Sequence, residues 1–181
     1  MNKAVAVVGM CGSGKSVLCD YFCQLGWQKV YFGGVTMTEL KKSGLEVNEE
    51  NERNMREHLR KTYGMGAFAV LLKEEILQKL QQGNVVLDGL YSWSEYLILK
   101  ELLGESLLLL AVVTDCSIRK ARLVNRKIRP LTAEEVDARD KAEIERSEKG
   151  GPIAKADHFV INNGTEEQLR LQFLEFVNTL K

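Results

Sequence analysis

The chain has 181 residues, the size of a single domain, and 45% of them are hydrophobic while 28% are charged. This balance, with only two prolines, excludes a disordered chain and a collagen-like repeat. The 25 Lys and Arg residues are matched by 25 Asp and Glu residues, so the formal net charge is zero. Binding to nucleic acid or to an anionic membrane through bulk charge is therefore excluded as well.

Five short apolar runs predict β-strands at residues 4–8, 29–32, 84–87, 107–113 and 158–161. Four of them show little alternation, which is typical of strands covered on both faces. Segments of helical period lie between them, and the last helix is expected to begin at Thr165, where Gln168 completes a capping box. Alternating strands and helices predict an α/β fold with a five-stranded parallel sheet, in which residues 1–181 form one domain.

Two polar stretches, residues 34–64 and 117–150, are too long for simple connections. Ligands bind such sheets beyond the carboxyl ends of the strands, so both stretches are candidates for moving parts over a site there. No apolar run approaches the about 20 residues that a membrane helix needs. The four cysteines follow neither a secreted framework nor a paired CxxC metal spacing. We therefore expect a cytoplasmic protein with no membrane partner.

The strongest motif is GMCGSGKS at residues 9–16, which matches G-x-x-x-x-G-K-[ST] between the first predicted strand and a helix. Its glycines let backbone N–H groups converge on one anion, and the helix directs its positive end at the same phosphates. Lys15 would reach the β- and γ-phosphates, and Ser16 would offer its hydroxyl to Mg²⁺. The alternative is a glycine turn that matches by chance. We expect ATP with Mg²⁺ to bind at Gly12, Ser13, Gly14, Lys15, Ser16 and Val17.

An acid, Asp88, directly follows the third predicted strand. At that position a carboxylate could reach Mg²⁺ or its waters. A turn formed by Asp88 and Gly89 is the alternative.

Four arginines, at 119, 122, 126 and 129, are spaced by 3, 4 and 3 residues, which predicts that one helical face carries all of them. Such a stripe can close over a triphosphate and stabilise charge during phosphoryl transfer. A solvated basic face and an RNA-binding stripe are the alternatives. Six acids follow between residues 134 and 145. They argue against a nucleic-acid-binding surface and favour a hinged lid whose charges compensate one another.

Three further arginines, Arg53, Arg56 and Arg60, recur at the same helical spacing in the first polar stretch. They could bind an anionic acceptor. Alternatively, they pair with acids of the same helix at residues 49, 52 and 57 on an exposed face.

With these motifs the chain resembles the adenylate-kinase-related P-loop kinases, a group that also contains the dephospho-CoA kinases. The resemblance rests on GMCGSGKS, on VVLDGLYS, which is similar to the DGFPR segment of adenylate kinases, and on the arginines after the fourth strand. It also rests on VINNGT, which is similar to the Asn-Gly loop that borders adenine in such kinases. Residues 33–66, with NERNMREHLRKTYGMGAFA, most resemble a poorly characterised adenylate-kinase-like family found mostly in archaea.

The resemblance implies a P-loop kinase that uses ATP and Mg²⁺, with residues 34–64 as a helical acceptor-side insertion and residues 117–150 as a helical lid. Lys15 and Ser16 would hold phosphates and metal, and Asp88 falls where these kinases keep a metal-shell acid. Arg122 and Arg126 fall in the lid, where they would act in catalysis. Asn163 with Gly164 would border the base.

The chain also departs from this pattern. The acid and arginine that adenylate kinases carry after the second strand are missing from residues 33–37, and Tyr91-Ser92-Trp93 replaces the DGFPR arginine. The Asp that dephospho-CoA kinases use as a base is absent too. A phosphate acceptor is already ionised and needs no base. We therefore favour transfer of the nucleoside monophosphate kinase type, from ATP to a small phosphate-bearing acceptor.

Three other functions remain open at this stage. One is transfer to a hydroxyl, such as that of dephospho-CoA, with Asp88 as base. Another is a nucleotide-driven switch whose polar stretches bind a partner protein. Nucleic-acid binding through the arginine stripe is least favoured, because the net charge is zero.

Overall fold

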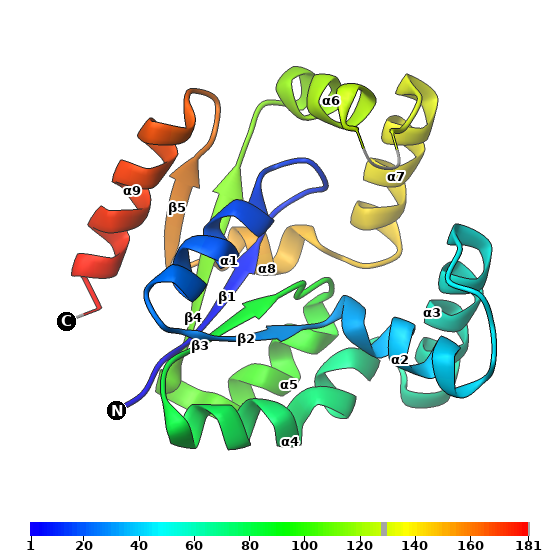
Figure 1. Cartoon of the computed structure of the whole chain (residues 1–181), viewed down its shortest axis with the longest axis horizontal. Coiled ribbons are helices and arrows are strands. Elements are labelled where there is room, and N and C mark those ends of the chain that lie inside the picture. Colours follow the sequence, from blue (N-terminus) through cyan, green and yellow to red (C-terminus); the bar gives the residue numbers. More distant parts are fainter. Residues whose placement is uncertain (128–129, 181) are drawn as a thin grey trace.

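The computed structural model describes residues 1–127 and 130–180 and contains a five-stranded, all-parallel sheet with the strand order β2-β3-β1-β4-β5 (Figure 1). Three strands have the predicted bounds, and β2 and β3 are shifted by one residue, so that β3 includes Asp88. The predicted parallel α/β sheet is confirmed. The strands are β1 (Ala4–Val8), β2 (Gln28–Tyr31), β3 (Val85–Asp88), β4 (Leu107–Val113) and β5 (His158–Ile161).

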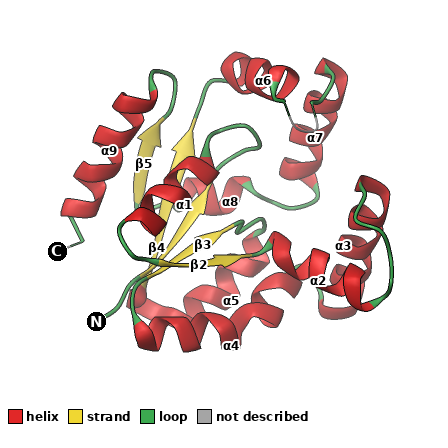
Figure 2. Ribbon diagram, in the orientation of Figure 1, coloured by secondary structure: helices red, strands yellow, loops and turns green. Residues whose placement is uncertain are grey.

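Helices cover both faces of the sheet (Figure 2). On one face, α1 (Lys15–Gln24) and α9 (Glu166–Asn178) pack Phe22, Phe173 and Phe176 against Val5 and Val7 of β1. On the other face lie α4 (Ala67–Gln82), α5 (Trp93–Leu103) and α8 (Gly150–Ala154), in a core cluster that includes the alternate residues of β1. Because both faces of β1 are buried, its sequence carries no polar alternation.

The two polar stretches fold as helix pairs that stand outside these layers (Figure 1). The first contains α2 (Gly33–Lys42) and α3 (Glu49–Tyr63), and α3 is fixed by its buried residues Met55 and Leu59. The second contains α6 (Cys116–Asn125) and α7 (Ala133–Glu145). None of the helices in the described ranges is both long and apolar enough to cross a bilayer.

The prediction of one helical face with four arginines is wrong. Helix α6 ends at Asn125, and Arg126 has extended backbone angles. The chain turns back at this point, because the N–H of Leu131 donates to the carbonyl of Leu123 at 3.2 Å. Arg126 therefore leaves the face that holds Arg119 and Arg122, and Arg129 lies outside the described residues.

One of the two edges of the sheet is formed by β5 and is bordered by α9. The capping box predicted at Thr165 and Gln168 is present and starts α9. One turn further, the side-chain amide of Gln172 accepts the N–H of Ile161 at 2.9 Å and donates to its carbonyl at 2.8 Å. The edge backbone of β5 is thus hydrogen-bonded by a side chain at Ile161.

Candidate functional site

The motif of residues 9–16 joins β1 to α1 and includes the first two residues of that helix. Its loop is curled by glycines at positive φ. Gly12 has φ +79°, and a Cβ there would approach Cγ of Leu123 in α6 to 2.9 Å. Gly14 has φ +100°, and a Cβ there would overlap the side-chain amide of Asn162. L-residues rarely adopt these angles, so the motif's glycines are required both for the curl and for the close approach of neighbouring segments.

Side chains from distant segments fix the loop by its carbonyl groups. The amide of Asn162 and the hydroxyl of Thr114 donate to the carbonyl of Ser13 at 2.8 and 3.1 Å. Arg119 donates to the carbonyl of Cys11 at 3.0 Å. The loop is thereby held from the ends of β4 and β5 and from α6, and none of these contacts was predicted from the sequence.

Lys15 begins α1 and its ammonium donates back to the carbonyl of Met10 at 3.0 Å. Burial, and then the positive charge of Lys149, lower the pKa of Lys15 from 10.5 to about 8. A buried ammonium that is short of negative charge is suited to receive an anion. The predicted phosphate-binding lysine therefore lies inside the loop, while Ser16 is exposed beside it.

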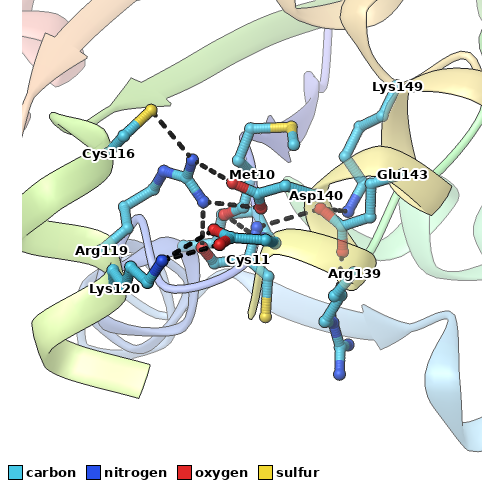
Figure 3. Close-up of polar contacts among 11 residues, drawn as sticks. Met10, Cys11, Cys116, Arg119, Lys120, Arg139, Asp140, Glu143 and Lys149 are labelled. Atoms are coloured by element: carbon cyan, nitrogen blue, oxygen red, sulfur yellow. Dashed lines mark hydrogen bonds and ion pairs between the residues drawn. The ribbon is translucent and has the colours of Figure 1, made fainter. Parts of the chain in front are cut away.

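Two charged residues beside the loop had no signal in the sequence (Figure 3). Glu143 of α7 accepts the backbone N–H of Cys11 at 3.0 Å through Oε2. The same oxygen is 2.7 Å from Nζ of Lys149, which lies between α7 and α8. Although burial opposes it, the charge of Lys149 lowers the pKa of Glu143, so the acid is held as a carboxylate.

Asp88 ends β3, directly beside Val7 of the strand that leads into the loop. Its carboxylate lies 2.9 Å from Nζ of Lys29, a β2 residue that the sequence did not single out. A hydroxyl from Ser16 and a carboxylate from Asp88 are oxygen ligands of the kind that Mg²⁺ prefers. Within the described part of the chain, no group of three or more His, Cys, Asp or Glu side chains could hold a metal without further ligands.

The arginines of residues 117–150 have different surroundings. Arg119 is 5% exposed and forms a two-point ion pair with Asp140 at 2.9 and 2.6 Å, so it joins α6 to α7 (Figure 3). Lys120 pairs with Asp137 at 2.8 Å. These pairs confirm that acids of the second polar stretch compensate its basic residues. Arg119 is thus engaged within the protein.

Arg122 remains close to the loop. One of its guanidinium nitrogens is 3.4 Å from Oδ1 of Asn162, the residue that holds the Ser13 carbonyl. The other terminal nitrogen is buried, with no hydrogen-bond partner in the described ranges. This geometry places an unsatisfied cationic donor one side chain away from the loop.

Asn163, predicted to border the base together with Gly164, joins two loops. Its Oδ1 accepts the N–H of Asp115 at 2.9 Å, which connects the segments after β4 and β5. Both Asn163 and Gly164 are exposed. Their contact with a base stays a prediction.

The arginines of α3 do not act as one surface. Arg53 is exposed. Arg56 pairs with Glu52 at 3.5 Å, which is the alternative expected for an exposed helix. The side chain of Glu49 lies outside the described part of the structure.

Arg60 is the arginine of α3 that is turned toward the interior. Its guanidinium lies 5.8 Å from the ring centroid of Phe68, and its Nε is buried without a hydrogen-bond partner in residues 1–127 and 130–180. Glu95 of α5 is fully buried nearby, where its charge acts on Arg60. Burial raises the pKa of Glu95 to about 7. Oε1 of Glu95 is also buried without a hydrogen-bond partner among the described residues, so α3 and α5 each carry one such atom here.

Comparisons with known proteins show which family the chain belongs to. No family model matches the chain. A UPF0200 protein of Thermococcus kodakarensis is 33% identical over 180 residues, which cover 97% of each chain. The chain belongs to the UPF0200 family. Another UPF0200 protein, from Methanosarcina barkeri, is 29% identical over 178 residues, covering 97% of this chain and 95% of the relative. The resemblance to an uncharacterised archaeal family is confirmed.

Solved structures show which fold this UPF0200 protein has. Shikimate kinase from Bacteroides thetaiotaomicron matches with a TM-score of 0.61 and 14% identity over 98% of each chain. Dephospho-CoA kinase from Campylobacter jejuni matches with a TM-score of 0.57 and 14% identity, covering 99% of this chain and 98% of that one. At such low identity these matches show the fold alone, and that fold is one of P-loop kinases.

Proposed function

We propose that this UPF0200 protein is an ATP- and Mg²⁺-dependent phosphotransferase of the nucleoside monophosphate kinase type, which moves the γ-phosphoryl group of ATP to a small, phosphate-bearing acceptor. One observation carries the proposal. The glycine-curled loop encloses the ammonium of Lys15, whose pKa is lowered to about 8 by burial and by Lys149. A polyphosphate would supply the negative charge that this ammonium lacks.

The residues of the site would divide the work as follows. Lys15 and the loop N–H groups would bind the β- and γ-phosphates, and Asn163 with Gly164 would border the base. Arg122 and Arg126 would neutralise the charge of the transferring group, and closure of residues 117–150 would exclude water. Mg²⁺, which Ser16 and Asp88 would hold, neutralises phosphate charge when it is bound. Catalysis is then positioning and charge stabilisation.

The acceptor would bind between α3 and the start of α5. Support comes from Arg60, whose Nε is buried and without a hydrogen-bond partner among the described residues. A guanidinium suits a phosphate group because it offers several N–H donors in one plane. Arg56 and the exposed Arg53 would add positive charge at the entrance of the same segment.

A hydroxyl acceptor is the second candidate. It is supported by the fold match to a dephospho-CoA kinase and a shikimate kinase. The base for it would be Asp88, but this carboxylate is 2.9 Å from the ammonium of Lys29. The carboxylate is thus already bound to a cation within the protein, and we therefore favour the phosphate acceptor.

An ATP-consumption screen against nucleoside monophosphates, dephospho-CoA and small hydroxylated metabolites tests the proposal. We expect stimulation by a phosphate-bearing acceptor, and its loss in Lys15→Ala. Arg126→Ala should slow transfer by about 10²-fold, the usual effect of removing one charge-stabilising contact. The exposed Arg170 of α9 offers the matched control, Arg170→Ala. Turnover that survives Lys15→Ala, or equal rates for the two arginine variants, contradicts these roles.

A further inference from the structure

The carboxylate of Glu143 lies against the phosphate loop, at the residue directly before Gly12, the first residue expected to bind ATP. Its Oε2 accepts the N–H of Cys11 at 3.0 Å, and Cys11 is the third residue of the phosphate-loop motif (Figure 3). Backbone N–H groups of such loops are donors for phosphate oxygens. A carboxylate oxygen accepts the same donors with the same charge sign. Glu143 therefore stands in for a phosphate oxygen at this donor.

Lys149 is bound to that carboxylate and is almost completely buried. Its side chain is 2% exposed, its Nζ is 2.7 Å from Oε2 of Glu143, and it lies 5.0 Å from the ring centroid of Tyr91. Its backbone N–H also donates to the carbonyl of Glu143 at 3.1 Å. A buried ammonium is costly unless it is paired. Lys149 thus points its charge into the protein beside the loop, although the sequence places it in a polar Glu-Lys-Gly-Gly turn.

The charges around this position do not balance. Lys149 is buried and Lys15 is partly buried. Their charges repel each other, and this repulsion is the second cause, after burial, of the lowered pKa of Lys15. Glu143 acts on both lysines, and its other oxygen lies 3.5 Å from Nε of Arg139. The Glu143 carboxylate thus acts on two repelling lysines, Lys15 and Lys149. A phosphate chain, with two or more negative charges, would neutralise them more completely.

We propose that Glu143 occupies the phosphate position of the loop in the empty protein, and that Lys149 is a second phosphate-binding lysine. A polyphosphate displaces the Glu143 carboxylate from the N–H of Cys11, and Lys149 then pairs with the phosphate instead. Glu143 is a built-in competitor of the nucleotide, and Lys149 is the cation that both anions share. The inference rests on the proposed function, because it takes the anion to be the polyphosphate of a nucleotide.

The experiment measures the affinity of tripolyphosphate and of Mg²⁺-ATP, without acceptor, by titration calorimetry. We expect Glu143→Gln to bind both about tenfold more tightly than wild type, because the competing charge is gone. Lys149→Met should bind both at least about tenfold more weakly, and Lys149→Arg should recover most of the loss. Glu145→Gln is the matched control, since Glu145 lies on the same helix and its side chain is 60% exposed.

Glu143→Asp provides a second variant if Glu143→Gln does not fold. It keeps the charge but shortens the side chain, so the carboxylate no longer reaches the N–H of Cys11, and binding should again be tighter than in wild type. An ion pair that only holds α7 to α8 gives a different result. Both Glu143 variants and Lys149→Met would then unfold at lower temperature while every folded variant binds with wild-type affinity, which overturns the inference.

The two ligands separate this inference from the proposed function. If wild type and the Glu143 and Lys149 variants bind Mg²⁺-ATP with the same affinity, the inference is overturned and the kinase proposal stays intact. If tripolyphosphate binds with the expected pattern but ATP does not, the roles of Glu143 and Lys149 in anion binding are kept and the kinase proposal is overturned. Wild type that binds neither ligand overturns both.

Discussion

Replacing Lys15 by methionine should make the empty protein more stable while it removes nucleotide binding. The buried ammonium donates to the Met10 carbonyl at 3.0 Å and has no acid within the loop itself. Its pKa is lowered from 10.5 to about 8, chiefly by burial and then by Lys149. A lowered pKa means that folding acts against the charged form, so the charge of Lys15 destabilises the folded state.

The size of the effect follows from the pKa. At about 1.4 kcal/mol per pKa unit, the change from 10.5 to about 8 corresponds to about 3 kcal/mol. The hydrogen bond to Met10 is lost in the variant and costs about 1 kcal/mol. The net gain is then about 2 kcal/mol, which raises Tm by roughly 4–8 °C for a chain of this size.

The difference between the two proteins should depend on pH in a defined way. Below pH 8, Lys15 is charged in both the folded and unfolded states, and the folded state carries the full cost. From pH 8 to 10.5 the folded protein loses its proton before the unfolded chain does, so wild type gains stability and the difference shrinks. The same residue would thus weaken the empty fold and bind the ligand, a trade-off between stability and function.

Thermal unfolding by circular dichroism at pH 7, 9 and 10.5, without nucleotide, measures this difference. Lys73→Met, on the exposed face of α4, is the control and should change stability by less than about 0.5 kcal/mol. Addition of Mg²⁺-ATP should raise the Tm of wild type and leave that of Lys15→Met unchanged. A variant that unfolds at or below the wild-type temperature at pH 7 refutes the reasoning.

Two further predictions concern stability. Arg119→Met breaks the buried ion pair with Asp140 and should lower the free energy of unfolding, measured in urea, by about 3 kcal/mol. Lys120→Met breaks an exposed pair and should lower it by less than about 1 kcal/mol. Equal losses in the two variants would contradict the difference in burial. Because burial raises the pKa of Glu95 to about 7, its charge destabilises the fold increasingly from pH 4.5 to 7. Glu95→Gln should be as stable as wild type at pH 4 and more stable by up to about 3 kcal/mol at pH 8. A stability difference between the two proteins that does not change with pH would contradict this prediction.

The sheet could be predicted because its signals are local. Apolar runs such as residues 4–8 and 107–113 are buried on both faces, and burial of this kind needs no knowledge of the partner strand. The loop before Lys15 could likewise be predicted, because glycines at fixed spacing between a strand and a helix indicate a particular backbone conformation. The end of α6 could not be predicted. The spacing of the arginines predicted a helix that continues past Asn125, whereas the chain turns back there through a tertiary contact.

The missing part of the site is made by contacts between distant segments. Glu143 meets Cys11 across 132 positions of sequence, and Asn162 meets Ser13 across 149. An acid in a helix rich in acids, or a lysine before two glycines, has the pattern of a solvated surface. Lys149 is buried only because α7 and α8 bring it under the loop, and no property of its neighbours in sequence indicates this.

The amide of Gln172 has a consequence for how the molecule behaves at high concentration. An open strand that carries bulky apolar side chains invites pairing with another copy, and Phe159 and Ile161 are 55% and 59% exposed. By accepting and donating at Ile161, Gln172 imitates the peptide group of a sixth strand. An incoming chain would have to displace the Gln172 amide before it could pair with Ile161, so at this position the exposed apolar edge is protected from self-association through the main chain.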